Sequence, residues 1–146
     1  MWKPDDKKKI IIKLLFMIVA ISACGNSIDS MVDSHFGRCA YFIFYDLRKG
    51  EYEFESNKQR GVFSGAGISA AQFVVDRGSK AVISGNYGPK AFGVLKEGGV
   101  KMYKCQGESA SAAIEKLRQK ELSEVNGVSF DGGNFKRGIN EERREA

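Results

Sequence analysis

Asp33-Ser34-His35-Phe36-Gly37-Arg38-Cys39 lies between two apolar runs, residues 16–23 and 41–45, and decides how the chain folds. Both runs are short and rich in β-branched and aromatic residues, which predicts strands. The connection between them is too short for a crossover helix, so the second strand should run antiparallel to the first. The same stretch carries the single histidine of the chain and one of its three cysteines.

Downstream, residues 51–55 alternate glutamate with Tyr52 and Phe54, which predicts an edge strand whose aromatic residues face the core. Two further strands each follow a helix, so they should lie parallel to the first strand through right-handed crossovers. The predicted fold is α/β, with a mixed five-stranded sheet in the order 3-2-1-4-5. The expected helices span residues 66–77, about 89–97 and 109–120, and the expected strands between them span residues 80–84 and 100–104.

The chain of 146 residues suits one domain with a sizeable core. We expect residues 1–16 to be an N-terminal extension and residues 17–122 to form the α/β domain. Apolar periodicity stops at residue 123, and glycine and charged residues follow, which predicts a disordered tail over residues 123–146. No segment reaches the roughly 20 uninterrupted apolar residues of a membrane span.

The net charge of +5 comes largely from basic residues near the two ends, which is typical of solvated termini rather than of a nucleic-acid surface. Three cysteines without paired spacing exclude a disulfide framework. Free thiols fit a reducing compartment, so the expected location is cytoplasmic.

A different function class stays open at the N-terminus. A basic start, an apolar run and Ile21-Ser22-Ala23-Cys24 are similar to a lipoprotein signal, which would export the protein and attach a lipid to Cys24. Lys13 interrupts the apolar run, however, and cleavage before Cys24 would remove the first predicted strand. We therefore rank this interpretation second.

The predicted topology brings Cys24, Cys39, Cys105 and His35 to one rim of the sheet, where open α/β sheets bind ligands. Thiolate and imidazole together select zinc, copper(I) or iron–sulfur species. The close ligand pairs of a structural zinc site are missing, so a larger cluster held by one or two protein ligands fits better.

The turn at residues 85–88 precedes a predicted helix and could bind an anion through backbone N–H groups. Because short glycine motifs have little specificity, a phosphate- or nucleotide-binding module that uses residues 85–89 remains an alternative.

Val32-Asp-Ser-His-Phe-Gly-Arg-Cys39 and the Gly-Asn-Tyr-Gly-Pro turn at residues 85–89 resemble the dinitrogenase iron–molybdenum cofactor biosynthesis family, in one register from about residue 17 to 122. The resemblance implies a ribonuclease-H-like fold and a role in nitrogenase cofactor biosynthesis for nitrogen fixation. It also implies non-catalytic binding, carrying or storage of an iron–sulfur or molybdenum-containing cluster.

By this resemblance, the family's proposed cluster-ligating histidine falls on His35, and Cys39 matches the cysteine that ends the segment. Arg38, Asn86 and Gly88 are the other expected cofactor contacts, since they can offset the negative charge of a cluster. The expected partners are the cluster and cluster-assembly or nitrogenase proteins, with no nucleic acid and no membrane. The first strand lacks the carboxylates of a metal-dependent nuclease, so we expect no enzyme activity.

Overall fold

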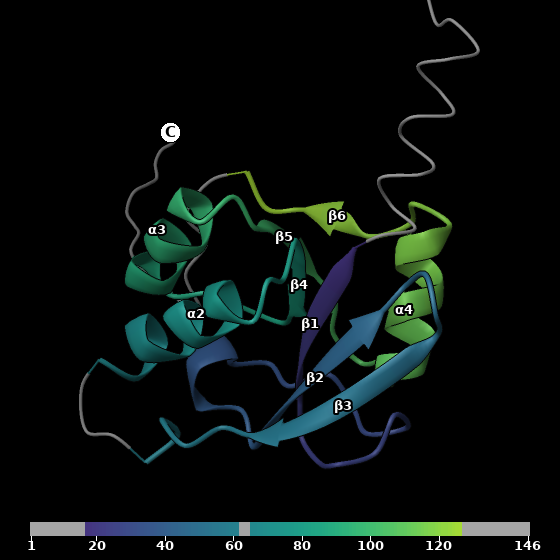
Figure 1. Cartoon of the computed structure of the whole chain (residues 1–146), viewed down its shortest axis with the longest axis horizontal. Helices are drawn as coiled ribbons and strands as arrows, with labels where there is room; N and C mark the ends of the chain where they lie inside the picture. The colour runs from purple at the N-terminus through teal and green to yellow at the C-terminus, as the bar shows by residue number, and fades with distance from the viewer. Residues whose placement is uncertain (1–16, 62–64, 127–146) are drawn as a thin grey trace, which may run out of the picture.

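A six-stranded sheet in the order β3-β2-β1-β4-β5-β6 forms the middle layer of the domain (Figure 1). The computed structural model describes residues 17–61 and 65–126. The predicted α/β class and the order 3-2-1-4-5 are confirmed, and a sixth strand is added at the far edge. The strands are β1 (Ile18–Ala23), β2 (Tyr41–Asp46), β3 (Glu51–Ser56), β4 (Ala81–Ser84), β5 (Lys101–Lys104) and β6 (Ser123–Glu124).

β1 lies at the centre of the sheet. It pairs antiparallel with β2, with Ile18 opposite Asp46 and Ala23 opposite Tyr41, and parallel with β4. Residues 19–23 are buried, because helices cover both faces of the sheet at this point. This position explains why the first apolar run is continuous rather than alternating.

The helices form a layer on each side of the sheet. α2 (Ala66–Asp76) and α3 (Pro89–Glu97) cover one face, and α4 (Ala110–Arg118) covers the other (Figure 1). The loop between β1 and β2 contains a short 3-10 helix, η1 (Phe36–Arg38), which the sequence did not predict. The three long helices agree with the predicted ranges to within two residues.

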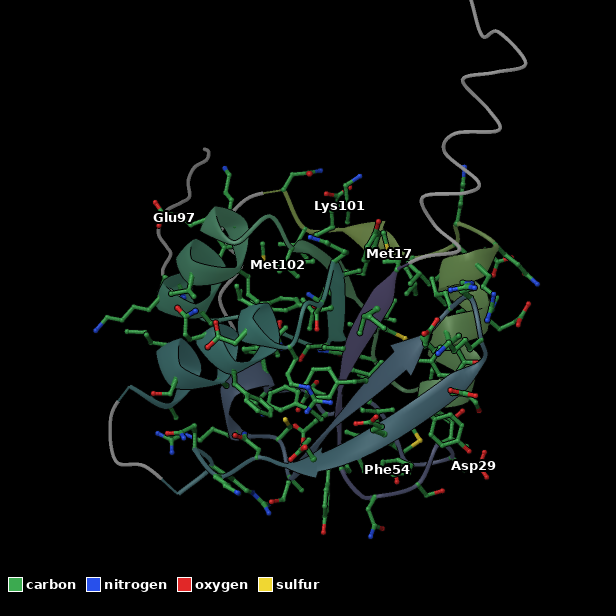
Figure 2. All side chains as sticks on the ribbon, in the orientation of Figure 1. Met17, Asp29, Phe54, Glu97, Lys101 and Met102 are labelled. Atoms are coloured by element: carbon green, nitrogen blue, oxygen red, sulfur yellow. The ribbon has the colours of Figure 1, made fainter. Side chains whose placement is uncertain are left out.

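Two hydrophobic cores fill the spaces between the sheet and the helices (Figure 2). Successive strand residues alternate between the cores, as the period of a strand requires. The α2/α3 core includes Ala20, Phe42, Phe44, Val82 and Met102, and the α4 core includes Val19, Ile21, Ile43, Ala81 and Ile83.

β6 corrects the expected start of the tail at residue 123. Its two residues pair antiparallel with β5, and the Val125 N–H donates to the Met102 carbonyl at 2.8 Å. A two-residue strand is too short to show a periodic pattern, so the sequence did not predict it. The rest of the predicted tail, residues 127–146, and the predicted extension, residues 1–16, lie outside the described residues.

The edge strand β3 is exposed more than its alternation predicts. Phe54 is half-buried, but Tyr52 is 41% exposed and stacks on Tyr45 with ring centroids 5.8 Å apart. An edge strand has a neighbouring strand on one side only, so the ring of Tyr52 stays partly uncovered. On the opposite face, the side chains of Glu53 and Glu55 remain exposed to solvent and also form salt bridges with Arg77.

The position of β1 argues against cleavage before Cys24. Removing residues up to 23 would delete the strand that joins β2 to β4 and would divide the sheet. The lipoprotein interpretation at this cysteine is therefore incompatible with the folded domain. Over the described ranges, no helix has the length and apolar content needed to cross a membrane.

Candidate functional site

The His35 turn is fixed by hydrogen bonds within its own sequence. The Asp33 carboxylate accepts a bond from the His35 backbone N–H at 2.9 Å, and the Ser34 hydroxyl lies 3.1 Å from His35 Nδ1. Phe36 is buried and anchors η1 in the α2/α3 core. The His35 side chain is exposed, so a rigid backbone presents its imidazole to solvent.

A second turn, residues 85–88, joins the end of β4 to α3 and lies against the first. The Gly85 N–H donates to the Asp33 carbonyl at 3.0 Å, and the Phe36 N–H donates to the Asn86 carbonyl at 3.2 Å. The buried Tyr87 hydroxyl donates to the Tyr103 carbonyl at 2.7 Å, which ties this turn to β5. The two loops that the sequence singled out therefore form one unit.

Two buried serines beneath these loops were missed by sequence reasoning. Ser22 is the penultimate residue of β1 and Ser84 is the last residue of β4, and their Oγ atoms are 2.8 Å apart. Ser22 Oγ also donates to the Asp33 carbonyl at 3.2 Å. A buried hydroxyl in an otherwise apolar strand needs a hydrogen-bond partner. A serine near the carboxyl end of each apolar run was therefore the available signal.

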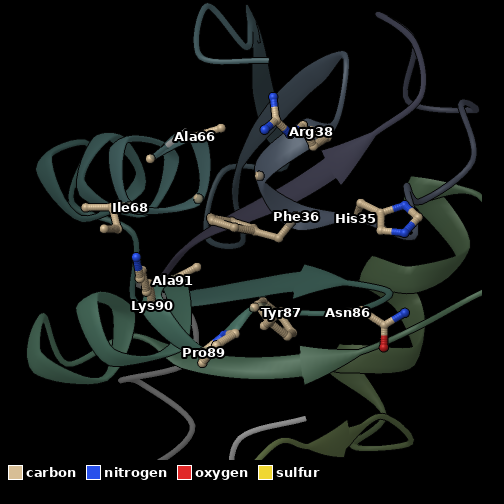
Figure 3. A pocket seen from close by; sticks show the side chains of 14 residues that line it. His35, Phe36, Arg38, Ala66, Ile68, Asn86, Tyr87, Pro89, Lys90 and Ala91 are labelled. Atoms are coloured by element: carbon tan, nitrogen blue, oxygen red, sulfur yellow. The ribbon is translucent and has the colours of Figure 1, made fainter. Parts of the chain in front are cut away.

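A pocket of about 540 Å³ opens where the two turns meet the first turns of α2 and α3 (Figure 3). Its volume lies in the usual range for small-ligand sites. Figure 3 shows His35 and Asn86 at one end of the pocket, and Ile68 and Lys90 at the other. The pocket is lined by His35, Phe36, Gly37, Arg38, Gly65, Ala66, Gly67, Ile68, Asn86, Tyr87, Gly88, Pro89, Lys90 and Ala91.

The electrostatics of the pocket favour an anion. α2 begins after Gly65 and α3 after Gly88, and neither helix has a side-chain cap or an acidic residue in its first turn. By contrast, the Ser109 hydroxyl caps α4. First-turn N–H groups and the helix dipole give each start a partial positive charge, and both starts line this pocket. Lys90 adds a full positive charge.

Cys39 does not join His35 in this pocket, which corrects the expected ligand pair. Its side chain is fully buried in the α2/α3 core. Phe36 and Cys39 both pack into this core. Phe36 also lines the pocket together with His35 and Arg38, whereas Cys39 does not. Burial, and secondarily the charge of Asp33, raise the pKa of Cys39 to about 12. The thiol is therefore closed off from the pocket by the core that surrounds it.

The expected gathering of all three thiols is wrong as well. Cys24 is exposed beside Asp33. Cys105 is buried in the α4 core, on the opposite face of the sheet from Cys39. Partial desolvation raises the pKa of both thiols, and a nearby carboxylate, Asp33 for Cys24 and Glu108 for Cys105, adds to the rise. Across residues 17–61 and 65–126, no three His, Cys, Asp or Glu side chains lie together as a metal site would require.

The structure does bring together the four other predicted contact residues. His35, Arg38, Asn86 and Gly88 all line the pocket, although they come from two separate loops. The Arg38 guanidinium donates to the Arg60 carbonyl at 2.8 Å. Sequence reasoning missed Lys90 and the first turn of α2, because nothing in the local pattern of α2 marks it as a partner of residues 85–88.

These features define a three-layer α/β domain with an anion-favouring pocket at the carboxyl ends of its parallel strands. Residues 17–120 match the dinitrogenase iron-molybdenum cofactor family. The match spans well over half of the chain, and the chain belongs to this family.

Known proteins are similar to this chain in sequence, and solved structures share its fold. An uncharacterized protein of Methanocaldococcus jannaschii is 32% identical over 108 residues, which are 72% of this chain and 88% of that protein. The apo form of the orange protein from Desulfovibrio gigas superposes with a TM-score of 0.76 at 29% identity, over 79% of this chain and 98% of the other. A NifB-type protein from Thermotoga gives a TM-score of 0.72 at 33% identity, over 80% and 100%.

Proposed function

We propose that the chain binds and carries an anionic metal–sulfur cluster in the pocket between the first turns of α2 and α3. The cluster would be an iron–sulfur or molybdenum-containing one, as in nitrogenase cofactor biosynthesis. One observation carries the proposal: two helix starts without side-chain caps line the same pocket as the imidazole of His35.

The donor set limits how a cluster could be held. His35 supplies one nitrogen ligand, while backbone N–H groups, Arg38 and Lys90 offset negative charge. With Cys39 buried in the core, the described part of the pocket offers no thiolate. The cluster would therefore arrive with its own sulfide ligands already in place, and the protein would receive it rather than build it.

Three comparisons support this proposal. The family is named for the iron–molybdenum cofactor. The Desulfovibrio gigas structure is an apo form, so that protein takes up a further group. The Thermotoga protein is assigned to the NifB type. We infer that the partners of this chain are cluster-assembly or nitrogenase proteins, and that it performs no catalysis of its own.

Phosphate is the competing anion, because first-turn N–H groups also bind phosphate. Two features favour the cluster over phosphate. Pro89 at the first position of α3 removes one of those N–H groups. The imidazole of His35 is a metal ligand, and phosphate offers no metal for it to coordinate. A nucleotide that raised the melting temperature more than a metal–sulfur anion would favour this alternative.

The experiment is an anaerobic titration of the full chain with tetrathiomolybdate, the simplest soluble molybdenum–sulfur anion, followed by absorption spectroscopy. His35→Ala should weaken binding by about 10- to 100-fold, which corresponds to loss of roughly 1.4–2.7 kcal/mol. Added free imidazole should restore part of the affinity. Gln119→Ala, an exposed change at the end of α4, is the control and should bind normally. Equal affinity in His35→Ala would show that His35 does not contribute to binding of the thiometallate anion.

A further inference from the structure

We propose that Gly37 and Asn57 are positioning residues that set the width of the pocket before any ligand enters. They hold the wall formed by residues 35–38 against the start of α2. The consequence for ligand binding rests on the proposed function, but the packing itself can be tested without a ligand.

Gly37 is in backbone-to-backbone contact with α2. A Cβ built on Gly37 would lie 2.8 Å from Gly67 Cα and 3.0 Å from Gly67 N. Both neighbours are main-chain atoms at the start of a helix, so neither can rotate away as a flexible side chain could. Any side chain at residue 37 must therefore push the wall and the helix apart.

Asn57 holds the same wall through hydrogen bonds to its backbone. Its side chain is only 7% exposed, and its Nδ2 donates to the Gly37 carbonyl at 3.1 Å and to the Cys39 carbonyl at 2.9 Å. Its Oδ1 accepts from the Gln59 N–H at 3.1 Å. A buried amide satisfied at both ends fixes the direction of the backbone that it bridges. Asn57 thus links the segment after β3 to the wall.

Cys39 reports on this packing, because it lies directly behind the wall. Its Sγ is 3.8 Å from Asn57 Nδ2, and its side chain is fully buried. Cys105 is buried in the other core, across the sheet, and serves as an internal control in the same molecule. Opening of the wall should expose Cys39 alone, whereas global unfolding should expose both.

The experiment is pulse labelling of the reduced, ligand-free full chain with N-ethylmaleimide, read for each cysteine by peptide mass spectrometry. In Gly37→Ala, Cys39 should react at least about 10-fold faster than in the wild type, while Cys105 keeps its rate. Asn57→Ala should give the same pattern and provides a second test where Gly37→Ala does not fold. Gly93→Ala, whose added Cβ meets open space on α3, should change neither rate.

Unchanged labelling of Cys39 in folded variants would overturn the inference, and so would a parallel rise at Cys39 and Cys105. A second measurement links packing to binding: folded Gly37→Ala should bind tetrathiomolybdate at least about 10-fold more weakly than the wild type. If the wild type itself binds no tetrathiomolybdate, the proposed function fails, while the labelling pattern still decides whether these residues set the packing of the wall.

Discussion

Gly85→Ala is expected to lower the free energy of unfolding by about 2–4 kcal/mol, since added volume at a packed backbone contact forces main-chain shifts. A Cβ on Gly85 would lie 2.6 Å from Ser34 Cα and 3.0 Å from the Ser34 carbonyl oxygen. The same displacement would stretch the bond from the Gly85 N–H to the Asp33 carbonyl. Urea unfolding followed by circular dichroism measures the change.

Gly93→Ala is the matched control for this prediction. Gly93 is exposed within α3, and its added Cβ would have no neighbour within 4 Å. Alanine has the higher helix propensity, so this variant should gain up to about 1 kcal/mol. A Gly85→Ala protein as stable as the wild type would show that the two loops are not in tight contact.

Lys90→Glu is expected to weaken anion binding by about 10- to 100-fold, because it replaces a positive charge that lines the pocket with a negative one. The same substitution should slightly stabilise the fold. Residue 90 lies in the first turn of α3, where a carboxylate gains about 0.3–1 kcal/mol from the helix dipole. Binding and stability should therefore change in opposite directions, as measured by tetrathiomolybdate titration and urea unfolding.

Lys96→Glu controls for net charge. Lys96 lies in the last turn of the same helix and does not line the pocket. Its replacement should leave affinity nearly unchanged at moderate ionic strength and should cost a little stability, since an acidic residue near a helix C-terminus is unfavourable. Equal losses of affinity in the two variants would indicate a general charge effect rather than a site at the start of α3.

The fold was predictable because its signals are local. The continuous apolar run of β1, the short connection to β2 and the alternation of helices and strands determine the strand order. β6 was not predictable, because it has only two residues. Its position depends on pairing with β5 and on the hydrogen bond from the Val125 N–H to the Met102 carbonyl.

The site was only partly predictable, since its geometry depends on one turn. His35, Arg38, Asn86 and Gly88 reach the pocket because residues after β1 and β4 meet at one edge of the sheet. After the 3-10 turn η1, the Cys39 side chain lies in the α2/α3 core. No residue pattern predicts a 3-10 turn of three residues. The contact of Gly37 with α2 joins segments 30 residues apart in the sequence, which only the packed structure reveals.

The central claim is tested most directly by recording amide spectra of the ¹⁵N-labelled wild-type chain during anaerobic titration with tetrathiomolybdate, and with molybdate as a sulfur-free dianion. We predict saturable shifts concentrated in residues 35–38, 65–68, 88 and 90–91, with much weaker binding of molybdate. Shifts centred on α4, equal binding of both anions, or no shifts at all would contradict a metal–sulfur site between the starts of α2 and α3.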